Sequence, residues 1–113
     1  MQQNLKVSVF VPSTFGENTP AESALVASVL DSVQCNFCTM FGGSTTIDGS
    51  GQWVNDSNEV VSEPVKIVYA FTDCDKVTCE SFLLAQSQYV RVQLAQTCVL
   101  WCIEPAFYGL QYA

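Results

Sequence analysis

The residues most suited to chemistry gather in one stretch, Phe41 to Phe71, with the sequence FGGSTTIDGSGQWVNDSNEVVSEPVKIVYAF. It contains an aromatic side chain, Trp53, and a carboxylate, Glu63, both expected at strand edges where a cleft would open. Gly42 and Gly43 begin the stretch, and glycine lets a backbone approach a ligand closely. We therefore expect any functional site to lie here.

The residue types that are missing narrow the chemistry further. The chain has no histidine, which excludes an imidazole base, a Ser-His nucleophile and a histidine-bearing metal site. No phosphate-binding GxGxxG or GxxxxGK[ST] motif occurs. Glu59, Glu63 and Glu104 stand as single carboxylates near strand ends, without a paired acid at a diagnostic spacing. This set of residues suits a reaction in which the protein positions the substrate and compensates its charge, without activating a water molecule.

Six cysteines raise the question of disulfides or metal. They are Cys35, Cys38, Cys74, Cys79, Cys98 and Cys102. Only Cys35-x-x-Cys38 has a spacing typical of metal or redox sites, and the other spacings differ from a zinc knuckle. We expect all six to be reduced and to behave as small apolar residues, and we expect no metal and no cofactor.

Composition limits the partners. The 113 residues predict a single domain, 1–113, with 49% apolar and only 13% charged residues. The net charge of −7 argues against nucleic acid and anionic membranes as partners, and favours a small cation or zwitterion. Because so little of the surface is charged, part of it is expected to be buried against another copy of the chain.

The first residues, MQQNLKVSVFVP, alternate between apolar and polar and contain no apolar run long enough for a signal sequence or a membrane span. We expect a cytoplasmic protein that does not enter a membrane.

Hydrophobic spacing predicts the elements of the first half. Residues 5–12 alternate as a half-buried strand does. Thr19-Pro20-Ala21-Glu22 combines a capping box with proline at the first helical position, so a helix is expected to begin at Pro20. Its apolar stripe predicts an end near Val33 or Gln34.

Turn residues and hydrophobic spacing predict the elements of the second half. Gly49-Ser50-Gly51 is expected to be a turn between two short strands, and Glu63-Pro64 to open a β-branched strand over 65–71. A helix is predicted from Lys76 or Thr78 to Ala95, followed by a strand over 98–103 that is buried on both faces.

The resulting order, β-α-β-β-α-β, predicts an α+β ferredoxin-like or GlnB-like sandwich. Such a fold places two helices on one face of an antiparallel sheet and leaves the other face open. The side chains expected on this second face, which would meet another subunit, are Phe10, Tyr69, Phe71 and Trp101.

Several of these features together resemble one enzyme family. They are Gly42-Gly43, Gly51-Gln52-Trp53, Glu63 before a β-branched strand, and the ending Gln96-Thr97-Cys98-Val99-Leu100 with Gly109-Leu110-Gln111-Tyr112-Ala113. In order and spacing they are similar to the phage enzymes that degrade S-adenosylmethionine, the SAM lyases formerly called SAM hydrolases. Where that family has tyrosine, this chain has Trp53.

The resemblance implies a GlnB-like homotrimer with active sites between subunits, working in the host cytoplasm. The reaction would convert S-adenosylmethionine to methylthioadenosine and homoserine lactone by attack of the substrate's own carboxylate. Glu63 would be the catalytic carboxylate. The expected substrate-binding residues are Trp53, Gly42, Gly43, Glu59 and Glu104. The alternative is a non-catalytic GlnB-like module that binds a nucleotide or a protein.

Overall fold

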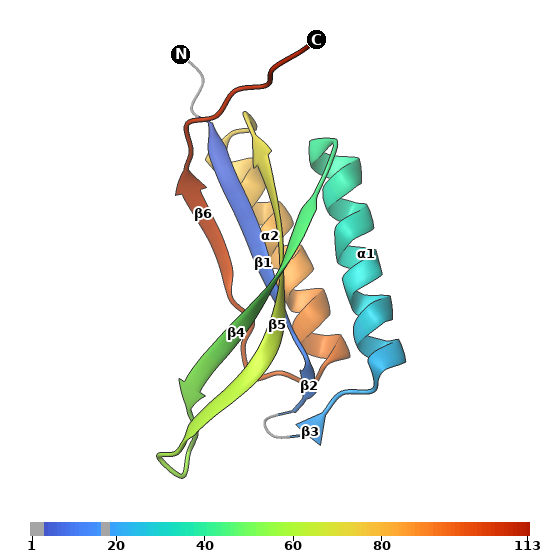
Figure 1. The fold of residues 1–113 in the computed structure, drawn as a ribbon, viewed down its shortest axis with the longest axis vertical. Helices are drawn as coiled ribbons and strands as arrows, with labels where there is room; N and C mark the ends of the chain where they lie inside the picture. The colour runs from blue at the N-terminus through green and yellow to red at the C-terminus, as the bar shows by residue number, and fades with distance from the viewer. Residues whose placement is uncertain (1–3, 17–18) are drawn as a thin grey trace.

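The computed structural model describes residues 4–16 and 19–113 and contains one antiparallel four-stranded sheet and two long helices (Figure 1). The elements are β1 (Leu5–Pro12), β2 (Thr14–Phe15), β3 (Thr19–Pro20), α1 (Ser23–Phe41), β4 (Thr45–Val54), β5 (Val60–Thr72), α2 (Lys76–Gln93) and β6 (Trp101–Pro105). The sheet order is β4-β5-β1-β6, while β2 and β3 pair separately. This arrangement confirms the predicted ferredoxin-like or GlnB-like fold.

The core lies between the sheet and the two helices. The alternation predicted for β1 is confirmed, because Val7, Val9 and Val11 are completely buried. α1 packs on β5, and α2 packs on β1 and β6. The other large side chains of this core are Val29, Val33, Phe37, Val68, Leu83, Val90 and Leu94. Burying them against one sheet face supplies most of the driving force for folding.

Strand register assigns side chains to the two sheet faces. Val9 pairs with Val68, so both lie on the core face, whereas Phe10 pairs with Ile67 on the second face. Tyr69 and Phe71 also lie on the second face, as predicted. The expectation for Trp101 was wrong. It pairs with Val9 and packs against the core, because β6 is in register with the core-facing positions of β1.

Helix α1 differs from its prediction at both ends. It begins at Ser23 after Glu22, which makes no side-chain cap hydrogen bond, while Thr19 and Pro20 form β3 opposite β2. It continues to Phe41 and ends at Gly42, whose φ of 84° is favourable for glycine. The predicted end near Val33 or Gln34 was wrong because the apolar stripe continues further.

Three phenylalanines explain that extension of α1. Phe37 and Phe41 contact Phe82 of α2 edge to face, with ring centroids 5.2 and 5.0 Å from that of Phe82. The rings of Phe37 and Phe41 are themselves 5.7 Å apart. Such edge-to-face pairs add to the stabilisation from area burial and hold the last turns of α1 on α2.

By length and composition, α1 is also the one helix in the described residues that could cross a membrane, with a mean hydropathy of 1.3. Its side chains Val29, Val33 and Phe37 are buried against the sheet and α2. A helix that packs into a core passes the same test of composition, so this apolar character does not by itself indicate a membrane segment.

The central stretch forms one long hairpin instead of several short strands. Gly49, Ser50 and Gly51 lie inside the ten-residue strand β4, so the turn expected there was wrong. A Cβ at Gly49 or Gly51 would approach the methyl groups of Val65 at 3.3 Å, and this cross-strand packing accounts for the glycines. The hairpin turn follows Asn55, in the Asn/Asp segment where the sequence also indicates a turn, and the Asn55 side-chain oxygen accepts from the backbone N–H groups of Ser57 and Glu59.

Strand β5 is longer than expected and extends past the sheet. It runs for 13 residues from Val60, so Glu63 and Pro64 lie within it and do not open it. Its pairing with β1 ends where Pro12 meets Val65, and beyond that point β5 pairs only with β4. Pro64, which has no backbone N–H, is tolerated where the strand has a neighbour on one side alone. The hairpin therefore projects as a two-stranded arm (Figure 1).

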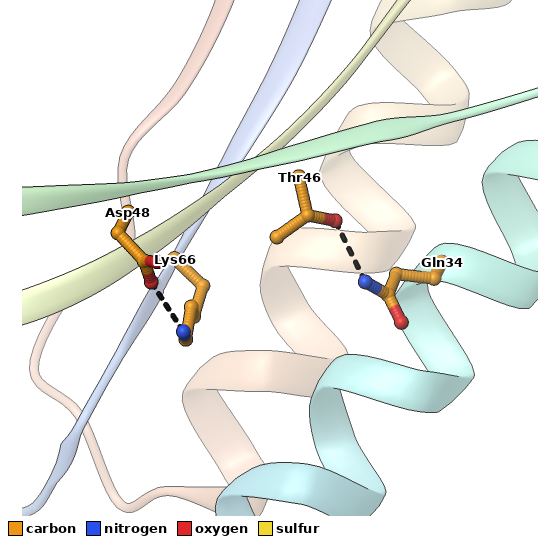
Figure 2. A network of polar contacts seen from close by, with 4 residues as sticks. All are labelled: Gln34, Thr46, Asp48 and Lys66. Carbon is orange, nitrogen blue, oxygen red and sulfur yellow. Dashed lines mark hydrogen bonds and ion pairs between the residues drawn. The ribbon is translucent and has the colours of Figure 1, made fainter.

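One polar contact connects this hairpin to α1, and another joins its two strands (Figure 2). Gln34 of α1 donates to the Thr46 hydroxyl of β4 at 2.7 Å, which joins the helix to the edge strand. Lys66 of β5 forms an ion pair with Asp48 of β4. Because both charged side chains are exposed to solvent, the ion pair contributes little to stability, about 0–1 kcal/mol.

The last two elements agree with prediction in part. α2 begins at Lys76 as expected, with Asp75 accepting from the backbone N–H of Thr78, but it ends at Gln93 before the predicted Ala95. β6 covers Trp101–Pro105, and the strand expected over 98–103 and buried on both faces was wrong. β6 is a half-buried edge strand, a position where Pro105 is tolerated.

Truncating the central ring of the aromatic cluster tests this core. Phe37→Ala should destabilise the protein by about 3–5 kcal/mol, because it removes a completely buried ring. Phe107→Ala, which truncates a fully exposed ring of the same size, should change the free energy of unfolding by less than about 0.5 kcal/mol. Urea unfolding measures both. Equal effects of the two changes would contradict the described core.

Candidate functional site

A cleft of about 410 Å³ lies on the second face of the sheet, where β1 ends and the β4–β5 arm projects. Its lining residues come from β1, from the arm and its turn, and from the segment after α2. They are Phe10, Pro12, Gly51, Gln52, Trp53, Val54, Asn55, Asp56, Glu63, Val65, Gln96, Thr97, Cys98, Val99 and Leu100. The structure thus brings Trp53 and Glu63, two of the predicted site residues, into one cleft.

The register of the hairpin brings them together. Gly51 pairs with Glu63, and Trp53 pairs with Val61, so these side chains share the second face of the sheet. Because Gly51 has no side chain, the position of β4 directly opposite Glu63 carries none. Phe10 of β1 adds an apolar surface beside the carboxylate. The cleft therefore combines aromatic and apolar walls with a single buried acid.

Glu63 is the polar centre of the cleft. Its side chain is only 9% exposed, and the Ser13 hydroxyl donates to Oε2 at 3.3 Å. No lysine or arginine is among the described residues that line the cleft. A buried carboxylate without a cationic neighbour is costly, and a positively charged ligand would offset that cost. The electrostatics of the site therefore favour a cation.

The other four predicted site residues do not line this cleft within one chain. Gly42 caps α1 and, with Gly43, leads into β4 at the end remote from the arm (Figure 1). Glu59 is exposed next to the hairpin turn, just before β5. Glu104 is exposed on β6 opposite Lys6, towards the other end of β1. Their roles in substrate binding stay predictions.

The cleft also has a wall that the sequence interpretation did not assign to the site. It is the segment from Gln96 to Leu100, which follows the end of α2 and precedes β6. Its apolar residues have the pattern of a buried strand. The sequence therefore did not indicate that they line the same cleft as Trp53 and Glu63. The available signal was the ending that begins at Gln96, which was part of the family resemblance.

Comparisons with known proteins agree with the fold. No protein-family model and no curated protein matches the chain. Two phage SAM lyase structures are similar, one in complex with S-methyl-5'-thioadenosine (TM-score 0.71) and one in the apo state (TM-score 0.68). Each is 14% identical and covers 93% of this chain, with 83% and 82% of the respective lyase chain covered. The predicted fold is the one that these phage SAM lyases have.

A third similar structure is the periplasmic divalent cation tolerance protein CutA from Archaeoglobus fulgidus. Its TM-score is 0.59 at 7% identity, with 96% of this chain and 88% of CutA covered. At these identities the three structures establish the fold and leave the activity to be argued from the site.

The cysteines offer no competing site. All six are free thiols, and no group of three potential metal ligands occurs in the described residues. Cys35 and Cys38 are exposed on α1, and Cys98 is exposed in the cleft wall. Cys79 lies on the buried face of α2, and this burial, together with the charges of Cys74 and Asp75, raises the pKa of its thiol.

These environments predict a graded thiol reactivity. The thiolate is the reactive form, so a raised pKa and burial both slow Cys79, by roughly tenfold or more relative to the exposed cysteines. A thiol reagent at mildly alkaline pH should label Cys35, Cys38 and Cys98 rapidly in the folded protein, and all six cysteines after denaturation. Peptide mass spectrometry identifies the sites. Rapid labelling of Cys79 in the folded protein would contradict its buried position.

Proposed function

We propose that this protein is an S-adenosylmethionine lyase, which forms methylthioadenosine and homoserine lactone. The observation that carries the proposal is the cleft, in which Glu63 is buried beside Trp53 with no lysine or arginine in the lining. S-Adenosylmethionine brings a sulfonium and an α-ammonium, so a negative, aromatic cleft suits it. The fold is shared with a phage SAM lyase whose structure holds a thioadenosine.

The proposed reaction is an internal displacement. An oxygen of the substrate carboxylate attacks the substrate's own γ-carbon, and the bond from that carbon to sulfur breaks. The bonding electrons go to sulfur, so the sulfonium becomes a neutral thioether while the lactone ring closes. No proton is transferred and no water is consumed. This balance matches a chain that has no histidine to serve as a base.

In this reaction the main role of the protein is to hold the substrate in the conformation from which its carboxylate attacks its γ-carbon. Glu63 accepts hydrogen bonds from the α-ammonium, which leaves the substrate carboxylate free to attack. Trp53 offers its ring face to a cationic or heteroaromatic part of the substrate. Phe10 and Val65 exclude water from the reacting atoms. Orientation and water exclusion of this kind are worth several kcal/mol of the barrier.

We also propose that the active protein is a homotrimer in the cytoplasm, with each cleft completed by a neighbouring subunit. Large apolar side chains on the second sheet face, including Ile47 and Phe71, are more than 40% exposed in one chain. A neighbour covering that face would bury them. It is also the arrangement in which Glu59 or Glu104 of a second subunit would reach a cleft.

Removing the charge of Glu63 tests its role. Glu63→Gln keeps the side-chain shape but loses a charge-assisted contact of about 3 kcal/mol, which should slow turnover roughly a hundredfold. Chromatography of methylthioadenosine formed from S-adenosylmethionine measures the rate. Circular dichroism and urea unfolding show whether the fold survives.

Two matched carboxylate variants test the competing assignments. Glu59→Gln and Glu104→Gln each remove one negative charge outside the lining of the cleft within one chain. Near-normal turnover of Glu63→Gln, together with loss of activity in either of these variants, would refute the assignment of Glu63. Binding of S-adenosylmethionine without turnover in the unmodified protein would instead favour a non-catalytic module.

The proposed assembly has its own test. Light scattering at micromolar concentration should give three times the mass of the 12.4 kDa chain. Phe71→Glu places a charge on the second face and should weaken the trimer, because a charge buried in an interface is unfavourable. A monomeric mass for the unmodified protein would contradict both the trimer and a site between subunits.

A further inference from the structure

The buried carboxylate of the cleft is contacted by one hydroxyl from a distant part of the chain. Ser13, directly after β1, donates through Oγ to Oε2 of Glu63 at 3.3 Å, although the two residues are 50 positions apart. Within residues 4–16 and 19–113, this is the hydrogen bond that the Glu63 side chain makes. Ser13 is not among the residues that line the cleft.

The loop that carries Ser13 is held in place from both sides. The Ser13 carbonyl accepts from the backbone N–H of Ala21 at 3.0 Å, and the N–H of Gly16 donates to the carbonyl of Leu94 at 2.9 Å. The side-chain amide of Gln96 lies 2.8 Å from the carbonyl oxygen of Thr14 and 3.0 Å from that of Gly16. Gln96 is itself part of the cleft wall. Hydrogen bonds therefore hold the backbone of residues 13–16, which carries Ser13, in place.

The two oxygens of the Glu63 carboxylate have different environments. Oε2 accepts from Ser13. No fully enclosed side-chain nitrogen or oxygen in the described residues lacks a hydrogen-bond partner, so Oε1, which has none among those residues, is not fully enclosed. Because Glu63 lines the cleft, the space that Oε1 reaches is the cleft. Oε2 of Glu63 is thus held by a hydrogen bond, and Oε1 is left available to a ligand in the cleft.

We propose that Ser13 is a positioning residue for the reaction: by engaging Oε2, it holds the Glu63 carboxylate with Oε1 directed at the bound substrate. This inference rests on the proposed lyase function. Without the hydroxyl, the carboxylate can rotate, and the substrate that it holds loses its in-line alignment. Misalignment of reacting atoms lowers the rate of the chemical step more than it weakens binding.

The test is a set of variants whose kcat and KM are measured with S-adenosylmethionine. Ser13→Ala should lower kcat roughly tenfold, with a smaller change in KM, because a hydrogen bond to a charged group is lost. Ser13→Thr retains the hydroxyl and should restore most of kcat. Ser62→Ala, an exposed serine next to Glu63 outside the cleft lining, is the matched control and should leave kcat unchanged.

A double variant separates positioning from a merely structural effect. If Ser13 acts through Glu63, then adding Ser13→Ala to Glu63→Gln should lower kcat by less than about twofold beyond Glu63→Gln alone. A structural effect would lower kcat by the same tenfold factor in both backgrounds. Urea unfolding of each variant shows whether a loss of rate follows a loss of fold.

The outcomes distinguish this inference from the function on which it rests. No formation of methylthioadenosine by the unmodified protein would overturn the proposed function, and the inference with it. Normal turnover by the unmodified protein, with Ser13→Ala equally active or with fully additive losses in the double variant, would overturn the positioning role alone. Non-additive losses with rescue by threonine support it.

Discussion

The cleft depends on Glu63, a largely buried acid whose carboxylate has no lysine or arginine beside it among the described lining residues. Such a group costs free energy unless something compensates it, and among the described residues its side-chain hydrogen bond comes from the hydroxyl of Ser13. The positive charge of a bound ligand would offset the rest of this free-energy cost. The cleft is therefore matched to a positively charged molecule.

The geometry of the sheet places that carboxylate. β5 continues beyond the point where β1 ends. Its first residues therefore pair with β4 alone and form an arm that extends past the end of β1. Glycine at position 51 leaves the space opposite Glu63 open, and Pro64 follows where the strand has a neighbour on one side. Gly51, which allows close packing against Val65, thus also lines the cleft.

Much of the fold could be predicted from local patterns, because burial on one face imposes a regular spacing. The alternation in β1 and the capped start of α2 are examples. α1 was predicted too short because its last turns are held by Phe82 of another helix. Gly49-Ser50-Gly51 was read as a turn because glycine favours turns locally, whereas packing against Val65 keeps these residues in a strand.

The candidate site could be predicted only in part, for a similar reason. Trp53 and Glu63 were identifiable because their side chains can bind a cation and fall on one hairpin. Ser13 and Gln96 were missed because their contribution comes from hydrogen bonds across the fold, to residues far away in sequence. An apolar run such as 98–100 cannot reveal from its composition that it borders a cleft.

The most direct test of the account follows the oxygen atoms of the product. The protein is incubated with S-adenosylmethionine in water labelled with heavy oxygen, and the homoserine lactone and the homoserine formed from it are analysed by mass spectrometry. Attack by the substrate's own carboxylate predicts an unlabelled lactone, and homoserine whose γ-hydroxyl oxygen is unlabelled because later hydrolysis of the lactone labels only its carboxyl group. Heavy oxygen at the γ-hydroxyl would show that water attacked the γ-carbon, and would contradict the internal displacement.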